Sequence, residues 1–172
     1  MELQACIFAT PLGFFGLVGR ERCVWRLVMG HRNAKDAWTR LHRDFAGESL
    51  VESDWHPTLM KKLEDFASGK RVSFDNVRVR TENRTEFQKK VILATRAVGF
   101  GETISYGELA VRAGSPNAAR AVGTVMATNH VPIIIPCHRV LASGGKLGGF
   151  SAPQGIQLKQ RLLDLEAQAL RG

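Results

Sequence analysis

The spacing of apolar residues changes near residue 84, and this change constrains the fold more than any other feature of the sequence. Before it, apolar runs of strand length alternate with turn residues such as Pro11-Leu12-Gly13. After it, apolar residues recur at helical spacing between glycines and prolines. The chain has 172 residues, which is enough for two hydrophobic cores. We therefore expect two domains, at residues 1–84 and 85–172.

The first domain is predicted to be a small α/β unit. Its elements are expected in the order of three strands, two helices and two short strands, at residues 3–9, 14–18, 23–29, 34–45, 56–67, 72–74 and 77–79. Cys6, Cys23 and His31 do not have the spacing of zinc ligands, so we expect no metal. The two cysteines are interpreted as strand residues that face a core.

The second domain is predicted to contain a helix-turn-helix. Thr85 is a suitable N-cap for a first helix that ends at Ala97. A second helix is expected at 106–113, and Ser115-Pro116 would begin a third that ends near residue 128. The last two have the spacing of a DNA-binding pair of helices. An ordinary helical hairpin within a core has the same spacing and remains an alternative.

The helix expected before residue 128 has an unusual exposed face. Arg120, Gly123, Thr124 and Ala127 share one stripe, and only the arginine has a long side chain. Such a helix can approach DNA closely but reads little of its sequence. The arginine could contact a phosphate, or fill the space that a base leaves when it is flipped out of the stack. Close packing of a protein neighbour would also explain the small residues.

The charge of the chain points to a polyanionic partner. Its 24 Lys and Arg residues outnumber 16 Asp and Glu residues, and between 103 and 161 six basic residues stand against Glu108 alone. No apolar run reaches the roughly 18 residues of a membrane-spanning helix, and no secretory signal is recognisable. Three widely spaced cysteines suit a reducing compartment. We therefore expect a cytoplasmic protein that binds nucleic acid rather than a membrane.

A cysteine with a neighbouring histidine follows a strand-like run. Residues 133–135 are all isoleucine and predict a buried strand, which Pro136 would end. Cys137 would then lie in a turn, where His138 could act as its base, directly or through a water. A buried cysteine that acts only as a small hydrophobic residue is the alternative.

The helix expected at residues 156–170 contains a carboxylate in an apolar stripe. Glu166 has leucine or alanine three and four residues away on both sides, so it needs a partner inside the protein. It could orient a histidine, as in nucleophilic sites, or pair with Arg139 or Arg161.

Several stretches together resemble the O6-alkylguanine-DNA alkyltransferases. The matching stretches are Gly101–Tyr106, Ala118–Gly123, Asn129 and Ile135–Val140. The similarity covers residues 85–168, and the pentapeptide Pro136–Val140 is its most specific part. The first 84 residues resemble the N-terminal domain of the family more loosely, in the Pro11-Leu12-Gly13 turn and in the order of strands and helices.

The resemblance implies a fold and a function. The fold would be α/β (α+β), with a small ribonuclease H-like N-terminal domain followed by a mostly helical C-terminal domain that holds the helix-turn-helix and the active-site cysteine. The protein would be a monomer that repairs double-stranded DNA containing O6-alkylguanine, or O4-alkylthymine, by a single transfer of the alkyl group to Cys137. It would need no cofactor, and in a bacterium it would be associated with the nucleoid.

The resemblance also implies residue roles. The catalytic group would be Cys137, His138, Glu166, Tyr106 and Asn129. The DNA-binding group would be Ser105, Ala119, Arg120, Ala121, Gly123 and Thr124. The pocket for the flipped base would be formed by Met126, Pro132, Val140, Gly148, Phe150 and Ser151.

Two positions depart from the usual family pattern, and other functions remain open. His130 stands where a proline is common, and Phe150 where a tyrosine is common. A lesion-binding relative that carries out no chemistry is the first alternative, although such relatives usually replace the cysteine by tryptophan. A thiol hydrolase with multiple turnovers would use Cys137 and His138, but it leaves the basic helix-turn-helix unexplained.

Overall fold

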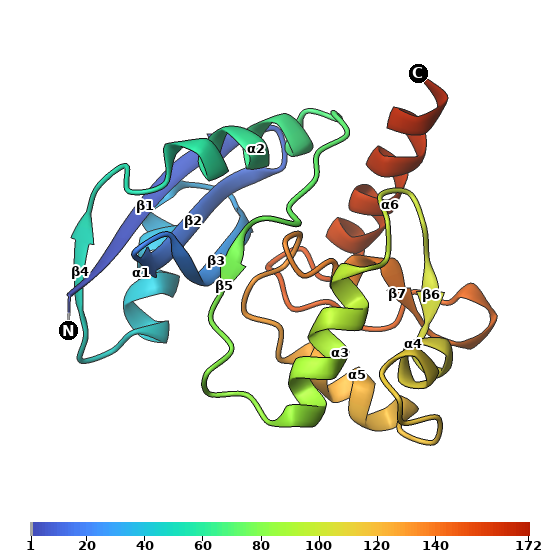
Figure 1. Cartoon of the computed structure of the whole chain (residues 1–172). Coiled ribbons are helices and arrows are strands. Elements are labelled where there is room, and N and C mark those ends of the chain that lie inside the picture. Colours follow the sequence, from blue (N-terminus) through green and yellow to red (C-terminus); the bar gives the residue numbers. More distant parts are fainter. Residues whose placement is uncertain (1) are drawn as a thin grey trace. The chain divides into compact units, whose positions relative to one another are not determined.

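The computed structural model describes residues 2–172, and the chain divides into two compact units, Met1–Arg80 and Thr81–Gly172 (Figure 1). The first unit is a sheet with two helices, and the second is mostly helical. The predicted fold class is therefore confirmed. The change of sequence pattern at residue 84 lies shortly after the division between the units.

A five-stranded sheet in the order β4-β1-β2-β3-β5 forms the first unit. Its strands are β1 (Glu2–Thr10), β2 (Gly13–Arg20), β3 (Cys23–His31), β4 (Ser49–Glu52) and β5 (Arg78–Val79). The first three are antiparallel, and β4 and β5 extend the two edges in parallel. Gly13 in the first turn has φ +97°, and a Cβ there would lie 2.8 Å from the His31 carbonyl oxygen, so the turn requires glycine.

The helices α1 (Ala34–Asp44) and α2 (Pro57–Ala67) cover this sheet. Leu3 and Ala5 of β1 share a core cluster with Leu41 of α1, and α2 packs against β1. The strand predicted at residues 72–74 is wrong, because this segment is a loop. Its apolar residue Phe74 is buried beside Phe66 of α2, with ring centroids 6.0 Å apart, so the apolar run fills a core without joining the sheet.

The second unit contains four helices and two short strands. The helices are α3 (Glu86–Arg96), α4 (Tyr106–Arg112), α5 (Ala119–Ala127) and α6 (Ile156–Arg171), the strands are β6 (Ile104–Ser105) and β7 (Val140–Leu141), and the 3-10 turns are η1 (Cys137–Arg139) and η2 (Ser143–Gly145). α3 has the predicted cap. The Thr85 hydroxyl accepts from the Gln88 N–H, and the Gln88 side chain accepts from the Thr85 N–H.

The predicted pair α4 and α5 is present, but α5 begins later than expected. Gly114 ends α4 with φ +82°. Ser115 does not cap α5, because its N–H donates to the Ala110 carbonyl and its own carbonyl accepts from the Ala118 N–H. These bonds close a turn before the helix, so α5 starts at Ala119.

The buried strand predicted at residues 133–135 is also wrong. Ile133 has φ +71°, which is costly for a β-branched residue, and the segment forms a tight loop. The Ile135 N–H donates to the Val131 carbonyl at 2.9 Å, and Pro132 and Ile135 form only an isolated bridge. The three isoleucines are buried as expected, but in a loop that leads into η1.

The parallel pair β6 and β7 brings the start of α4 close to the Cys137 turn η1. Ile104 lies opposite Val140 in this pair. Since β6 leads directly into α4 and η1 leads directly into β7, the first residue of α4 lies close to the turn that carries Cys137.

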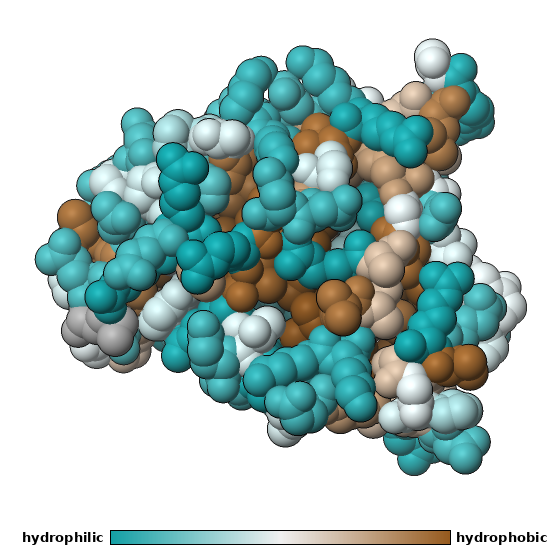
Figure 2. All heavy atoms as spheres, viewed as in Figure 1, coloured by the Kyte–Doolittle hydropathy of each residue, from teal (hydrophilic) through white to brown (hydrophobic). Residues whose placement is uncertain are grey.

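Hydrophilic side chains cover most of the face seen in Figure 2, with apolar side chains between them. None of the helices formed by residues 2–172 is long and apolar enough to cross a membrane.

Candidate active site around Cys137

Cys137 is the first residue of η1, and the loop before it holds it in place. Its N–H donates to the Ile135 carbonyl at 2.7 Å. The Asn129 side chain ties this loop together, because its amide nitrogen donates to the Ile135 carbonyl at 2.9 Å and its oxygen accepts from the Val131 N–H at 3.0 Å. The Asn129 side chain therefore connects the start of this loop to Ile135, two residues before Cys137.

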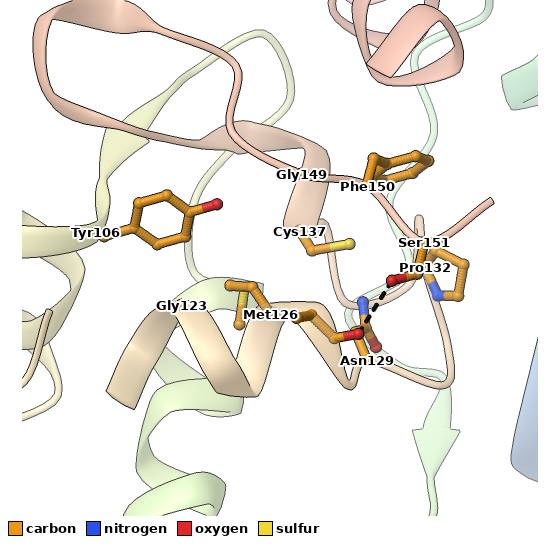
Figure 3. A pocket seen from close by; sticks show the side chains of 10 residues that line it. Tyr106, Gly123, Met126, Asn129, Pro132, Cys137, Gly149, Phe150 and Ser151 are labelled. Atoms are coloured by element: carbon orange, nitrogen blue, oxygen red, sulfur yellow. Dashed lines mark hydrogen bonds between the residues drawn. The ribbon is translucent and has the colours of Figure 1, made fainter. Parts of the chain in front are cut away.

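The Cys137 side chain is 8% exposed and borders a pocket of about 180 Å³ (Figure 3). The pocket is lined by Tyr106, Gly123, Met126, Ala127, Asn129, Pro132, Cys137, Gly149, Phe150 and Ser151. Figure 3 shows the sulfur between the Tyr106 ring on one side and Phe150 with Pro132 on the other. The Ser151 hydroxyl donates to the Ala127 carbonyl at 3.0 Å, which joins the loop before α6 to the end of α5.

Four of the six residues predicted for the base pocket are among those that line it, namely Met126, Pro132, Phe150 and Ser151. The other two lie outside the lining. Val140 is fully buried in β7. Gly148 packs against Tyr106, because a Cβ there would come within 2.8 Å of the Tyr106 hydroxyl. The neighbouring Gly149 lines the pocket instead.

Beside Cys137, Glu166 of α6 lies at the centre of a buried polar network. Its carboxylate is 2.7 Å from His138 Nε2 and accepts from the Arg139 guanidinium at 2.8–3.1 Å. The Gly101 N–H donates to it at 2.9 Å. Both partners that the sequence left open are therefore present, a histidine and an arginine. Arg161 is not part of this network and donates to Gln154.

Charge fixes the proton positions in this network. Burial acts to raise the pKa of Glu166, but the His138 hydrogen bond and the Arg139 charge outweigh it and hold the pKa at about 2. Burial lowers the pKa of His138, so the imidazole is neutral. Since an ionised carboxylate only accepts, Nε2 carries the proton of His138, and Nδ1 carries the lone pair. His138 is thus held in the tautomer in which Nδ1 can accept a proton.

The two titratable side chains that line the pocket, Cys137 and Tyr106, are protonated at neutral pH. Burial raises the pKa of the Cys137 thiol, against the opposing effects of a hydrogen bond with Asn129 and the charge of Lys159. Burial, and then the charge of a Cys137 thiolate, raises the pKa of Tyr106. The thiol must therefore lose its proton during a reaction, while the Tyr106 hydroxyl stays available as a donor.

The residues predicted to contact DNA are on the exposed side of α5 and at the start of α4. Arg120, Ala121 and Thr124 are exposed, and Ala119 and Gly123 are half-buried. Ser105 has a structural task as well, because its hydroxyl caps α4 by accepting from the Glu108 N–H at 3.1 Å. Of these residues, only Arg120 has a long side chain.

One buried residue next to this site is missing from the sequence prediction. Lys159 of α6 is 1% exposed, and its ammonium donates to the Val140 carbonyl at 2.8 Å. A sequence signal existed, because Lys159 precedes Glu166 by seven residues and so lies on the same apolar stripe of the helix.

A thiol at the foot of a small pocket, next to a helix-turn-helix with an exposed arginine, is typical of DNA-binding proteins with a nucleophilic cysteine. Residues 86–168 match the family model described as the 6-O-methylguanine DNA methyltransferase DNA-binding domain. The methylated-DNA–protein-cysteine methyltransferase of Methanosarcina mazei is 42% identical over 167 residues, covering 96% of this chain and 98% of its own. That of Mycolicibacterium paratuberculosis is 35% identical over 161 residues, covering 91% and 88%.

Solved structures that resemble this chain come from the same family as these relatives. The Mycobacterium tuberculosis OGT in complex with DNA is 30% identical and has a TM-score of 0.78 over 96% of this chain and 94% of that one. The chain therefore belongs to the methylated-DNA–protein-cysteine methyltransferase family, and the resemblance seen in the sequence is confirmed.

Proposed function

We propose that the protein repairs DNA by moving an alkyl group from the O6 atom of a damaged guanine to the Cys137 sulfur, once per molecule. The observation that carries this proposal is the position of the Cys137 thiol, at the foot of a pocket and next to a neutral histidine held by a buried carboxylate. A nucleophile is usually activated by a neighbouring base that a third group orients; here His138 is the base and Glu166 orients it.

The pocket fits one flipped base. Its volume of about 180 Å³ corresponds to about six water molecules, which is the scale of a single planar ring system. The guanine would enter over α5, and Arg120 would fill the space that it leaves in the duplex. The small side chains of the same face allow close approach at any sequence, which suits a protein that must find rare lesions. In a bacterium its place of action would be the nucleoid.

The reaction begins with loss of the thiol proton. The Cys137 proton passes to His138 Nδ1, directly or through one water, and Glu166 stabilises the imidazolium that forms. Arg139 keeps Glu166 ionised, so the carboxylate does not take the proton itself. Asn129, which holds the loop and bonds the sulfur, keeps Cys137 aimed at the pocket.

The transfer itself is an in-line displacement. The thiolate sulfur forms a bond to the alkyl carbon, the bond from that carbon to O6 breaks, and its electron pair stays on the guanine. The Tyr106 hydroxyl donates a hydrogen bond to the guanine as this charge develops. The guanine anion then takes up a proton, and the imidazolium of His138 releases the proton that it took from the thiol. The net change is that one proton is moved from sulfur to the guanine and the alkyl group is moved to sulfur. Regeneration would require the Cys137 thiolate to leave from the alkyl carbon, and because a thiolate is a poor leaving group from such a thioether, the protein is consumed.

Incubation with a duplex that carries one O6-methylguanine tests the proposal. The peptide that contains Cys137 should gain the mass of one CH₂, while the duplex loses it. Cys137→Ser should show no transfer, and the matched control Cys23→Ser should react like the parent. Absence of the added mass from the parent would contradict the proposal. Tight binding without transfer would identify a lesion-binding module, and repaired DNA in excess of protein would identify a hydrolase.

A further inference from the structure

Two carbonyl groups at the C-terminal end of α5 are bound by side chains from distant parts of the chain. The last carbonyls of a helix have no partner within the helix, so they must find one elsewhere. The Ala127 carbonyl accepts from the Ser151 hydroxyl at 3.0 Å, and the Thr128 carbonyl accepts from the Arg84 guanidinium at 3.1 Å. Ser151 belongs to the pocket, whereas Arg84 lies outside its lining, and the mechanism above gives Arg84 no task.

The Arg84 guanidinium binds α5 rather than the carboxylates next to it in the sequence. Glu82 and Glu86 lie two residues away on either side, and in the described part of the chain Arg84 forms an ion pair with neither. Thr128, which it does bind, is 44 residues away. Arg84 also directly precedes Thr85, the N-cap of α3, where the helix dipole disfavours a positive charge. The dipole favours a positive charge at the C-terminal end of α5, so the charge suits α5 and not the helix that follows it.

The bond from Arg84 ends directly before the residue that holds the nucleophile in place. Thr128 is the C-cap of α5, and Asn129 follows it. The Asn129 side chain ties together the loop that leads to Cys137, so the position of this loop depends on where α5 ends. Asn129 and the last turn of α5 also line the pocket. One bond at the end of α5 can therefore affect both the pocket wall and the direction of the sulfur.

The backbone of Arg84 is itself fixed. Its N–H donates to the Thr81 carbonyl at 2.9 Å, and α3, which starts two residues later, packs against α5. The side chain therefore extends from a defined point beside the end of α5. Since Arg84 is not part of the pocket lining, its bond to Thr128 can persist while a base occupies the pocket, whereas the Ser151 hydroxyl can turn toward the base.

We infer that Arg84 is a positioning residue for the alkyl transfer: its guanidinium holds the C-terminal end of α5, and through it the Asn129 side chain that keeps Cys137 aimed at the pocket. Displacement of a nucleophile from its line of attack slows an in-line reaction even when the substrate still binds. The effect on the transfer rate rests on the proposed function, but the hold on the Asn129 loop exists without DNA and is measured separately.

Amide hydrogen exchange of the free protein tests the hold on the loop. The Val131 N–H, bound by Asn129, and the Ile135 N–H, bound by the Val131 carbonyl, report on it. In Arg84→Ala both should exchange about tenfold faster, because a charged hydrogen bond at the end of α5 is lost. Arg171→Ala, with an exposed arginine at the end of α6, is the matched control and should exchange like the parent in this loop. Parent-like exchange of the loop in Arg84→Ala would overturn the inference.

Single-turnover rates test whether the hold serves the chemistry. Arg84→Ala should take the methyl group about 3- to 10-fold more slowly from both a saturating O6-methylguanine duplex and the free base, while its affinity for the duplex stays within about twofold. Arg84→Lys keeps a charged donor and should recover most of the rate. A phosphate contact by Arg84 would instead weaken duplex binding, reduce its salt dependence and spare the free base. A merely structural role would lower the free energy of unfolding and leave the transfer rate unchanged. Either result would overturn the inference.

A double-mutant cycle tests whether Arg84 acts through Asn129. Once Asn129 is replaced by alanine, loss of Arg84 should cost no further rate, so the double variant should transfer as slowly as Asn129→Ala alone, and additive losses would contradict the inference. The exchange data also separate the inference from the proposed function. Faster loop exchange in Arg84→Ala, with a parent that takes no methyl group, would defeat the proposed function and leave the hold of Arg84 standing. Methyl transfer by the parent, with parent-like exchange and rates in Arg84→Ala, would do the reverse.

Discussion

Between residues 2 and 80 the buried side chains are apolar apart from His31, whereas the second unit buries Thr95, His138, Arg139, Lys159 and Glu166. The first unit has a comparable charge cluster, but one that is partly open to solvent, where Asp44 accepts from Arg26 and Arg40 at 2.9 Å. A scaffold gains little from buried charge, because the loss of hydration offsets most of the attraction. On the proposed function, the charges inside the second unit serve the chemistry of Cys137.

The largest expected effect comes from removing the central carboxylate of each cluster. Glu166→Gln should lower the free energy of unfolding by about 3–5 kcal/mol, because Arg139 is left buried without its counter-ion. Asp44→Asn, in a cluster that is partly open to solvent, should cost less, about 1 kcal/mol. Alkyl transfer should slow about 100-fold in Glu166→Gln and stay unchanged in Asp44→Asn. Denaturant unfolding and single-turnover rates measure both, and equal stability losses would break the comparison.

Acid should act on the second unit through the same carboxylate. The pKa of Glu166 is lowered from 4.5 to about 2 on folding, so its contribution to stability is present above pH 4.5 and is lost as the pH falls toward 2. The amount is about 3 kcal/mol for a shift of this size. The pKa of His138 is lowered from 6.5, so the unfolded chain binds its proton first, and stability also declines as the pH falls below 6.5.

Unfolding experiments from pH 7 to pH 2 should therefore show a steeper loss of stability below pH 4.5 for the parent than for Glu166→Gln. Parallel curves for the two proteins would mean that Glu166 titrates normally in the folded state and that its network is weaker than the distances suggest.

An exposed charge of the second unit should behave in the opposite way. Arg120→Ala should leave stability unchanged, because Arg120 is solvent-exposed. It should slow the repair of duplex DNA about 10- to 100-fold, since the flipped base then lacks a substitute in the stack. The reaction with free O6-methylguanine base should change less than about twofold, and Arg171→Ala, at the end of α6, is the matched control. Equal losses on duplex and free base would remove the role of Arg120 in flipping.

Local signals made much of the fold and part of the site predictable. The first three strands and the Thr85 cap follow from turn residues and capping chemistry that lie within a few positions of each other. Glu166 was recognisable because a carboxylate inside an apolar stripe needs a partner. The same reasoning, applied to a lysine two turns earlier, would have found Lys159.

The errors arise where backbone and side-chain contacts of the folded chain override the preference of a residue type. Three isoleucines favour a strand, yet the Asn129 side chain binds both ends of the loop and holds Ile133 at φ +71°. Ser115 has the chemistry of an N-cap, yet its backbone closes a turn before α5. Gly149 lines the pocket through backbone placement, which residue type does not reveal.

The smallest effect expected tests whether the units differ in anything besides buried charge. The hydroxyl of Thr85 caps α3 in the second unit, and the Asn33 side chain caps α1 in the first by accepting from the Asp36 N–H at 2.8 Å. Each cap supplies one hydrogen bond to a backbone N–H that would otherwise be unpaired. Thr85→Ala and Asn33→Ala should therefore each lower the free energy of unfolding by about 1 kcal/mol, as measured by denaturant unfolding. Neither should alter alkyl transfer. A much larger cost for Thr85→Ala would show that α3, too, is coupled to the charged interior, and the contrast between the units would then extend beyond the residues around Cys137.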